Sequence, residues 1–128
     1  MKIYFAGNKQ IFADVNGFTV KTDQSPRGGG EGLYPEPFTM FLAALGTCAG
    51  IYAKSFCDQR GINTDGFYLT QDQEFDPIRK IIGKVILKIH VNQDFPEKYD
   101  QALISTVSLC AVKRHMREDI EFAVEVVR

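Results

Sequence analysis

The sequence has few cysteines, no excess of charge of either sign and no long uninterrupted hydrophobic run. Its 15 Lys and Arg residues nearly balance its 16 Asp and Glu residues, for a net charge of −1. It therefore lacks the basic surface that binding to a nucleic-acid backbone requires. The longest apolar stretch, within residues 38–53, is interrupted by Gly46, Thr47 and Gly50, and we expect it to be too short and too broken to span a bilayer. The N-terminus has no apolar stretch of signal-peptide length, so we expect a cytoplasmic protein.

The three cysteines are Cys48, Cys57 and Cys110. An odd number of cysteines in a chain without a secretion signal argues against a structural disulfide framework. None of them lies at metal-ligand spacing, and His90 and His115 stand far from them in the sequence, so we expect neither a metal site nor a cofactor. In the reducing cytosol each thiol is therefore either part of the core or chemically reactive.

The size and composition of the chain are those of one globular domain over residues 1–128, because 45% of its residues are hydrophobic and 24% are charged. Residues 16–17 are Asn-Gly, a strong signal for a tight hairpin turn between two strands. Alternating apolar residues and turn signals predict strands at residues 2–5, 10–15, 18–22, 65–74 and 80–92, and a final strand at Ile120, Phe122, Val124 and Val126.

Two helices are expected between these strands. The first begins at Pro37, which suits a first helical turn, and continues to about residue 60 before Gly61. Its first half is apolar nearly all round, as in helices that are buried. The second helix begins near residue 94 and has an apolar stripe that ends at Cys110. The fold class is therefore α+β, with a mostly antiparallel sheet packed on two main helices.

Both helices are expected to pack on the same face of the sheet, so Cys48 and Cys110 could meet. Cys57 follows Cys48 by nine positions, which places it on the opposite side of the helix. A buried cysteine often only fills space, and this alternative stays open for all three. A reactive Cys48 needs a lowered pKa, and its own helix N-terminus is about three turns away. We therefore expect a nearby cation.

The candidates for this cation are Arg27, Lys9 and Arg114. Arg27 lies in the main loop, residues 23–36, which contains three consecutive glycines at residues 28–30. The loop lacks the Gly-Lys-Ser/Thr sequence of a phosphate-binding loop. Arg114 follows Cys110 by four positions and shares its face if the second helix continues.

The run Pro-Phe-Thr-Met-Phe-Leu-Ala-Ala-Leu-Gly-Thr-Cys at residues 37–48, after the glycines of the loop and before Cys-Ala-Val at residues 110–112, resembles the OsmC/Ohr family. The resemblance covers nearly the whole chain in element order. It implies an OsmC-like fold and an intertwined homodimer, with N-terminal strands contributing to a shared sheet. It also implies a role in oxidative or osmotic stress defence.

In the characterised members a cysteine at the position of Cys48 attacks an organic hydroperoxide and becomes a sulfenic acid, and a cysteine at the position of Cys110 then closes a disulfide. A dithiol reduces that disulfide. An N-terminal arginine, held by a glutamate just before the buried helix, orients the peroxide. The resemblance thus implies a peroxiredoxin-like organic hydroperoxide reductase in which Arg27 or Lys9 supplies the cation and Glu36 the carboxylate.

The chain departs from this pattern at three places. Phe38 stands where the peroxidases have the glutamate, residues 2–22 contain no arginine, and Ala111 stands where they usually have proline. Two other functions therefore remain open. One is a dimeric module that binds a small apolar ligand through Phe38, Phe41, Tyr52 and Phe56. The other is a redox sensor that uses the Cys48–Cys110 disulfide as a switch.

Overall fold

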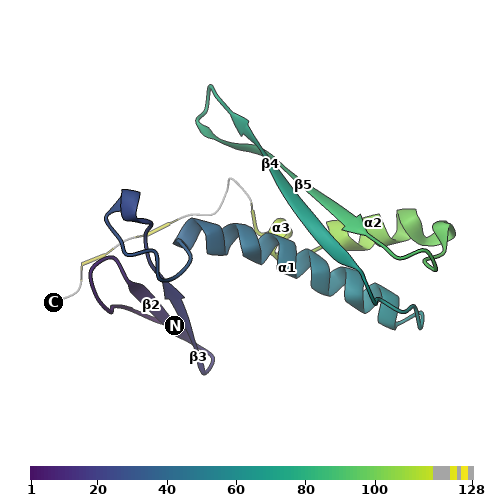
Figure 1. The fold of residues 1–128 in the computed structure, drawn as a ribbon, viewed down its shortest axis with the longest axis horizontal. Coiled ribbons are helices and arrows are strands. Elements are labelled where there is room, and N and C mark those ends of the chain that lie inside the picture. The colour runs from purple at the N-terminus through teal and green to yellow at the C-terminus, as the bar shows by residue number, and fades with distance from the viewer. Residues whose placement is uncertain (117–121, 124, 127–128) are drawn as a thin grey trace. The chain divides into compact units, whose positions relative to one another are not determined.

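The computed structural model describes residues 1–116, 122–123 and 125–126. It forms two compact units, one from Met1 to Ala44 and one from Leu45 onward, and a single long helix continues from the first into the second. Helices and antiparallel sheets are both present (Figure 1), so the predicted α+β class is confirmed. The predicted final strand at Ile120, Phe122, Val124 and Val126 includes positions outside the described residues.

The first unit is built on a three-stranded antiparallel sheet in the order β1-β2-β3. Asn16 and Gly17 both have positive φ, 49° and 82°, as a tight turn between twisted strands requires. The three strands predicted for this unit agree with the observed ones to within one residue, whereas the hairpin predicted at residues 65–74 and 80–92 is observed at 68–76 and 81–90. The elements of this unit are β1 (Lys2–Phe5), β2 (Ile11–Val15), β3 (Phe18–Thr22) and the 3-10 turn η1 (Pro26–Gly28).

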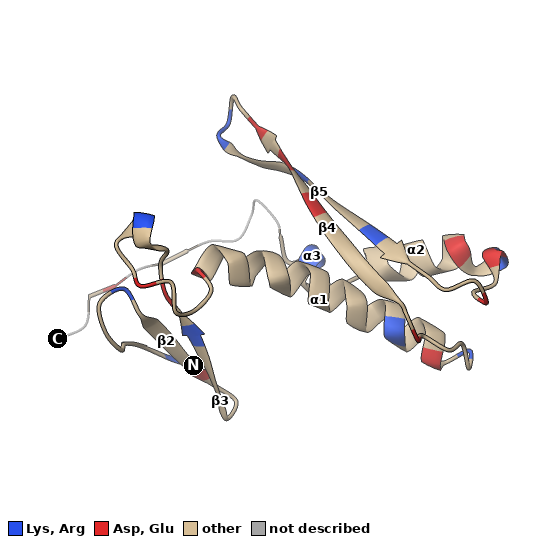
Figure 2. Cartoon of the chain, viewed as in Figure 1, with Lys and Arg blue, Asp and Glu red and all other residues tan. Residues whose placement is uncertain are grey.

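Helix α1 (Pro37–Asp58) is almost uncharged, with Lys54 and Asp58 near its C-terminal end (Figure 2). It is 22 residues long and, by length and composition, apolar enough to cross a membrane. The expectation that this segment is too short to span a bilayer is therefore wrong, because the helix continues past the glycines. The core helices of soluble proteins pass the same test, so this property alone is weak support for a membrane location.

The second unit packs the C-terminal half of α1 against a hairpin and a second helix. Its elements are β4 (Tyr68–Asp76), β5 (Ile81–His90), the 3-10 turn η2 (Glu97–Tyr99), α2 (Asp100–Ser108) and α3 (Ala111–Arg114). The core consists of Ala49, Ala53, Phe56, Cys57, Phe95, Leu103 and Val107, with Leu69, Leu87 and Ile89 of the hairpin packed against it. Burial of this cluster is what fixes α1 and α2 to one face of the hairpin.

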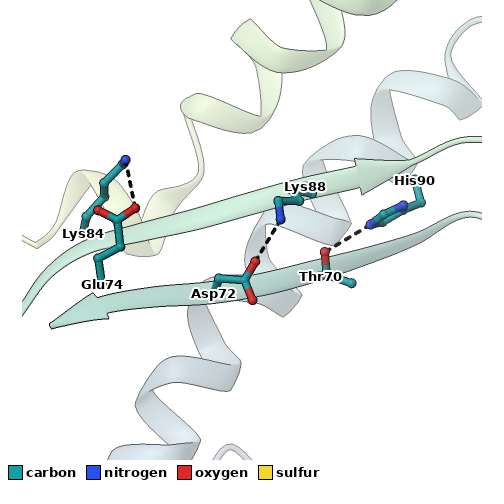
Figure 3. A network of polar contacts seen from close by, with 6 residues as sticks. All are labelled: Thr70, Asp72, Glu74, Lys84, Lys88 and His90. Carbon is teal, nitrogen blue, oxygen red and sulfur yellow. Dashed lines mark hydrogen bonds and ion pairs between the residues drawn. The ribbon is translucent and has the colours of Figure 1, made fainter.

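The opposite face of the hairpin is polar, as the alternation of residues predicts. Lys88 pairs with Asp72 at 3.1 Å and Lys84 with Glu74 at 3.2 Å, while the His90 ring stacks on Tyr68 with centroids 4.3 Å apart. Figure 3 shows both ion pairs, together with Thr70 and His90, along the two strands. The ion-paired side chains are more than half exposed, and such pairs contribute little to stability. This face is therefore a solvated surface.

Candidate functional site

Cys48 lies on α1 in the second unit and is half-buried. Two positions earlier, a β-carbon at Gly46 would lie only 3.0 Å from Oε1 of Gln71 on β4. A glycine at this position therefore leaves room beside the helix for the end of the Gln71 side chain. This explains why the sequence accepts a residue that costs a helix about 1 kcal/mol relative to alanine.

Cys110 does not continue the second helix, contrary to the prediction. Helix α2 ends at Ser108, and the Cys110 backbone is extended, with φ −54° and ψ 140°. Its Sγ instead accepts a hydrogen bond from the backbone N–H of Lys113 at 3.4 Å, so the thiol caps the short helix α3 as serine does in other proteins. Arg114 is the last residue of α3, and its N–H donates a hydrogen bond to the Cys110 carbonyl at 3.1 Å.

The structure brings the two predicted thiols together. The backbone N–H groups of Val112 and Ala111 and the Cys110 thiol lie near enough to the Cys48 sulfur to act on its pKa. The Val112 N–H has the largest effect on the pKa of Cys48; burial opposes it, and the net result is a pKa below the usual value of a thiol. Hydrogen bonds to a thiolate stabilise the charged form. The groups that lower this pKa are thus N–H and S–H donors, and not the cation that the sequence led us to expect.

Cys57 lies in the core and is fully buried. Burial raises the pKa of its thiol, and the Asp58 carboxylate adds to this, against smaller opposing effects of Lys54 and Arg60. A buried thiol with a raised pKa is a poor nucleophile. Cys57 therefore packs in the core beside α1, and its thiol is an internal control for the reactivity of the Cys48 thiol.

The other predicted site residues lie in the first unit. Lys9 and Arg27 are exposed, and Arg27 belongs to η1. The Glu36 carboxylate accepts a hydrogen bond from the Ser25 backbone N–H at 3.0 Å, and hydrogen bonds from Ser25 lower the pKa of that carboxyl. In the described residues Glu36 therefore closes the glycine loop onto the start of α1 and makes no ion pair with an arginine.

Asp23 is a residue that sequence reasoning missed. It is only 1% exposed, and its carboxylate accepts backbone N–H bonds from Gln24 at 2.7 Å, Leu33 at 3.1 Å and Glu31 at 3.3 Å. Burial alone would raise its pKa, but these N–H groups together lower it. The available signal was an aspartate directly after a strand and before a glycine-rich loop, where such side chains often accept backbone N–H groups.

The four aromatic residues of the predicted apolar-ligand site are divided between the units. Phe38 and Phe41 stack on each other in the first unit, with ring centroids 5.8 Å apart, and both are exposed. Tyr52 and Phe56 line a groove in the second unit. Among the residues that the structure describes, no three His, Cys, Asp or Glu side chains are grouped so that they could hold a metal ion.

A model of the OsmC-like protein family matches residues 28–125, which is most of the chain. The chain belongs to the OsmC-like protein family. A comparison with curated proteins gave no match. The resemblance seen in the motifs around Cys48 and Cys110 is thus confirmed at the level of the family.

Solved structures of this family share the fold. A Psychrobacter arcticus protein ascribed to the osmotic stress and detoxification response is 18% identical, with a TM-score of 0.76 over 92% of this chain and 88% of that one. An organic hydroperoxide resistance protein OsmC from Legionella pneumophila is 16% identical, with a TM-score of 0.61 over 91% and 87%. The organic hydroperoxide resistance protein OhrB of Bacillus subtilis is 17% identical, with a TM-score of 0.54 over 92% and 90%.

Proposed function

We propose that this OsmC-like protein reduces organic hydroperoxides with the Cys48–Cys110 thiol pair. The observation that carries the proposal is the surroundings of Cys48, where the Val112 N–H, the Cys110 thiol and the Ala111 N–H lower the pKa of its thiol. A thiolate is the nucleophile in such chemistry. The names of the Legionella and Bacillus relatives, which refer to organic hydroperoxide resistance, point in the same direction.

The reaction has three steps. The Cys48 thiolate attacks the outer oxygen of R–O–OH, the O–O bond breaks, and the departing alkoxide takes up a proton to leave as an alcohol. Cys48 is then a sulfenic acid, and the Cys110 sulfur attacks it, forming the disulfide and releasing water. A dithiol finally transfers two electrons and two protons to the disulfide, restores both thiols and becomes a disulfide itself.

We also propose that Lys9, Arg27 and Glu36 assist the reaction. The Arg27 guanidinium or the Lys9 ammonium would bind the peroxide, and Glu36 would hold the loop that carries Arg27. Glu36 is suited to this because its carboxylate already ties Ser25, two residues before Arg27, to the start of α1. An arginine offers several N–H donors in a plane and suits a peroxide better than a lysine does.

We also propose that the chain works as a homodimer in the cytoplasm. Leu33, Phe38 and Phe41 of the first unit are 63%, 57% and 41% exposed, and large apolar residues left in water often mark a protein–protein interface. In the second unit the β4–β5 sheet has only two strands in the described residues, and two-stranded sheets are marginal without further cover. Light scattering of the purified protein tests the dimer.

The activity is tested by following the loss of cumene hydroperoxide in the presence of the reduced protein and a dithiol. We expect Cys48→Ser to abolish turnover and Cys110→Ser to stop the enzyme at the sulfenic acid. Cys57→Ala is the matched control and should keep full activity. Turnover that survives Cys48→Ser would refute the proposal, and a Cys48–Cys110 disulfide formed without turnover would indicate a redox sensor.

A further inference from the structure

The turn that joins β4 to β5, with the strand ends beside it, leaves large apolar side chains in water. We call residues 75–82 the tip of the hairpin. Ile78 is 91% exposed, and Phe75 and Ile81 are each more than half exposed. The hairpin residues that pack against the core of the second unit lie near the other end of the two strands: Leu69, Leu87 and Ile89. The tip is therefore an apolar surface that this core does not cover.

Hydrogen bonds to Asp76 hold the backbone of the turn in one conformation. The Asp76 carboxylate accepts the N–H groups of Ile78 at 2.9 Å and of Arg79 at 3.0 Å. Its backbone carbonyl accepts the N–H of Lys80 at 2.9 Å. Pro77, directly after the aspartate, has a φ that its ring fixes. The exposure of Ile78 is therefore a property of an ordered turn and not of a loose loop.

Two cations, Arg79 and Lys80, follow Ile78 in the same turn, and Figure 2 shows them in blue at the end of the hairpin. Lys84 and Lys88, farther along β5, are both ion-paired. Among the residues that the structure describes, no carboxylate forms an ion pair with Arg79 or Lys80. With the one carboxylate of the tip counted, these two cations leave the tip a net charge of +1, whereas the whole chain has −1.

The backbone at Lys80 favours a different residue. Its φ is 58°, in the left-handed region that is uncommon and strained for a residue with a long side chain. Glycine adopts this conformation without that strain, so the turn alone would be better served by glycine. A lysine at this position indicates that its side chain has a use outside the turn.

We propose that the tip of the hairpin docks on the surface of an anionic lipid bilayer. Ile78, with Phe75 and Ile81 beside it, enters the boundary between headgroups and acyl chains. Arg79 and Lys80 pair with the lipid phosphate groups. An anionic bilayer suits this tip because its negative headgroups lie directly over an apolar interior, so it meets the cations and the apolar side chains together. The docking does not depend on the proposed thiol chemistry.

Docking is measured by co-sedimentation of the full chain with vesicles of equimolar phosphatidylglycerol and phosphatidylcholine, and with vesicles of phosphatidylcholine alone, in about 0.1 M salt. The wild type should bind the anionic vesicles much more tightly than the neutral ones. Ile78→Ser removes a side chain that the bilayer buries and should weaken binding by about 10- to 100-fold. Arg79→Gln and Lys80→Gly should each weaken it by about fivefold. Lys80→Gly should not lower the melting temperature, because glycine tolerates the positive φ.

Two matched variants serve as controls, and both should bind like the wild type. Ile104→Ser removes an isoleucine from an exposed position on α2. Lys88→Gln changes the net charge of the chain as much as Arg79→Gln does. Lys88 lies seven residues along β5 from Ile81, about 23 Å at 3.3 Å per residue, which is beyond the Debye length of about 10 Å at this salt concentration.

A fluorescent reporter shows which part of the chain enters the bilayer. The chain has no tryptophan, so Ile78→Trp places a single indole at the tip, and its emission should shift to the blue on addition of anionic vesicles. Ile104→Trp should show no shift. Turnover of cumene hydroperoxide without vesicles should be equal in Ile78→Ser and the wild type, which separates a failure of docking from a failure of the proposed function.

Four results would overturn the proposal. The first is a wild type that does not sediment with anionic vesicles, and the second is equal affinity for anionic and neutral vesicles, because the cations would then play no part. The third is an Ile78→Ser variant that binds anionic vesicles as tightly as the wild type. The fourth is dissociation of a dimer into monomers by Ile78→Ser in light scattering, because a second copy of the chain would then cover the tip.

Discussion

Phe56 is the side chain whose loss should damage the second unit most. It is 3% exposed and lies in the core formed by α1 and α2. Truncation of a buried phenylalanine to alanine costs about 3–5 kcal/mol. The ring also forms an edge-to-face pair with Tyr99, centroids 6.0 Å apart, worth about 0.5–1.5 kcal/mol, and carries the Arg60 guanidinium. We therefore expect Phe56→Ala to fall in the upper part of that range.

The assay is urea unfolding followed by far-UV circular dichroism, because the chain has no tryptophan to report by fluorescence. Unfolding should be measured at several protein concentrations, since subunit association would add to the apparent stability. Ile104→Ala is the control, because Ile104 lies on α2 and is 52% exposed, and it should cost less than about 1 kcal/mol. If Phe56→Ala costs no more than Ile104→Ala, the core as described does not stabilise this unit.

Three further predictions concern the thiols and the glycine loop. Iodoacetamide should alkylate Cys48 at lower pH than Cys57, because N–H donors lower the first pKa and burial raises the second; peptide mass spectrometry across pH measures this, and equal pH profiles would contradict it. Gly30→Ala should lower the melting temperature more than Gly28→Ala. The methyl group of Gly30→Ala would lie 2.0 Å from the backbone oxygen of Gln24, whereas that of Gly28→Ala would lie 3.1 Å from the end of the flexible Gln24 side chain. The pKa of Asp23 is lowered on folding, so its stabilising effect is complete above the ordinary value of 3.8 and is lost progressively as the pH falls from there through the lowered pKa. The protection of its N–H partners from hydrogen exchange should therefore fall in acid in the wild type, and it should not change with pH in Asp23→Asn.

The elements that could be predicted from the sequence are those whose ends are fixed by local chemistry. The hairpin at Asn16 and Gly17 was placed correctly because both residues tolerate the positive φ that the turn needs. The start of α1 at Pro37 was also correct. Its end was placed two residues late, since the last turn tightens, with the Arg60 N–H bonded to the Cys57 carbonyl, and such ends are ambiguous by one or two residues.

The break between α2 and α3 could not be predicted. Leu109 and Cys110 are neither glycine nor proline, so the sequence carries no local signal for an interruption. The break depends on the Cys110 side chain, which accepts the Lys113 N–H, and on burial of that thiol. Because the two contacts form only in the folded chain, the sequence favoured a continuous helix.

The same break explains why the sequence predicts a cation beside the Cys48 thiolate, where the structure has backbone N–H donors instead. A cation can be recognised in a sequence, whereas every residue except proline carries an N–H group, and only the backbone geometry decides where it points. The turn at residues 109–112 directs two of these groups at Cys48. The sequence thus allowed the two cysteines to meet, but it predicted neither the turn that carries Cys110 nor the donors that this turn supplies.

The turn at residues 109–112 relates two of the departures from the peroxidase pattern, the missing N-terminal arginine and the missing proline after the second cysteine. The peroxidases that the chain resembles usually have a proline after the second cysteine and an arginine in the N-terminal region. This chain has no arginine in residues 2–22 and has Ala111 in place of the proline. A proline has no N–H to donate, whereas Ala111 donates one to Cys48. The chain thus has a neutral donor at a position where a proline would supply none.

The substitution Ala111→Pro removes the Ala111 N–H and should introduce little backbone strain. Cys110 already has the extended backbone that a following proline requires, and residue 111 is the first of α3, where proline is well tolerated. We expect the fold to persist and the pKa of Cys48 to rise, so that its alkylation by iodoacetamide moves to higher pH. The shift should be smaller than that caused by losing the Val112 N–H, which has the larger effect on this thiol. An unchanged alkylation profile in a folded Ala111→Pro variant would show that the Ala111 N–H does not stabilise the thiolate.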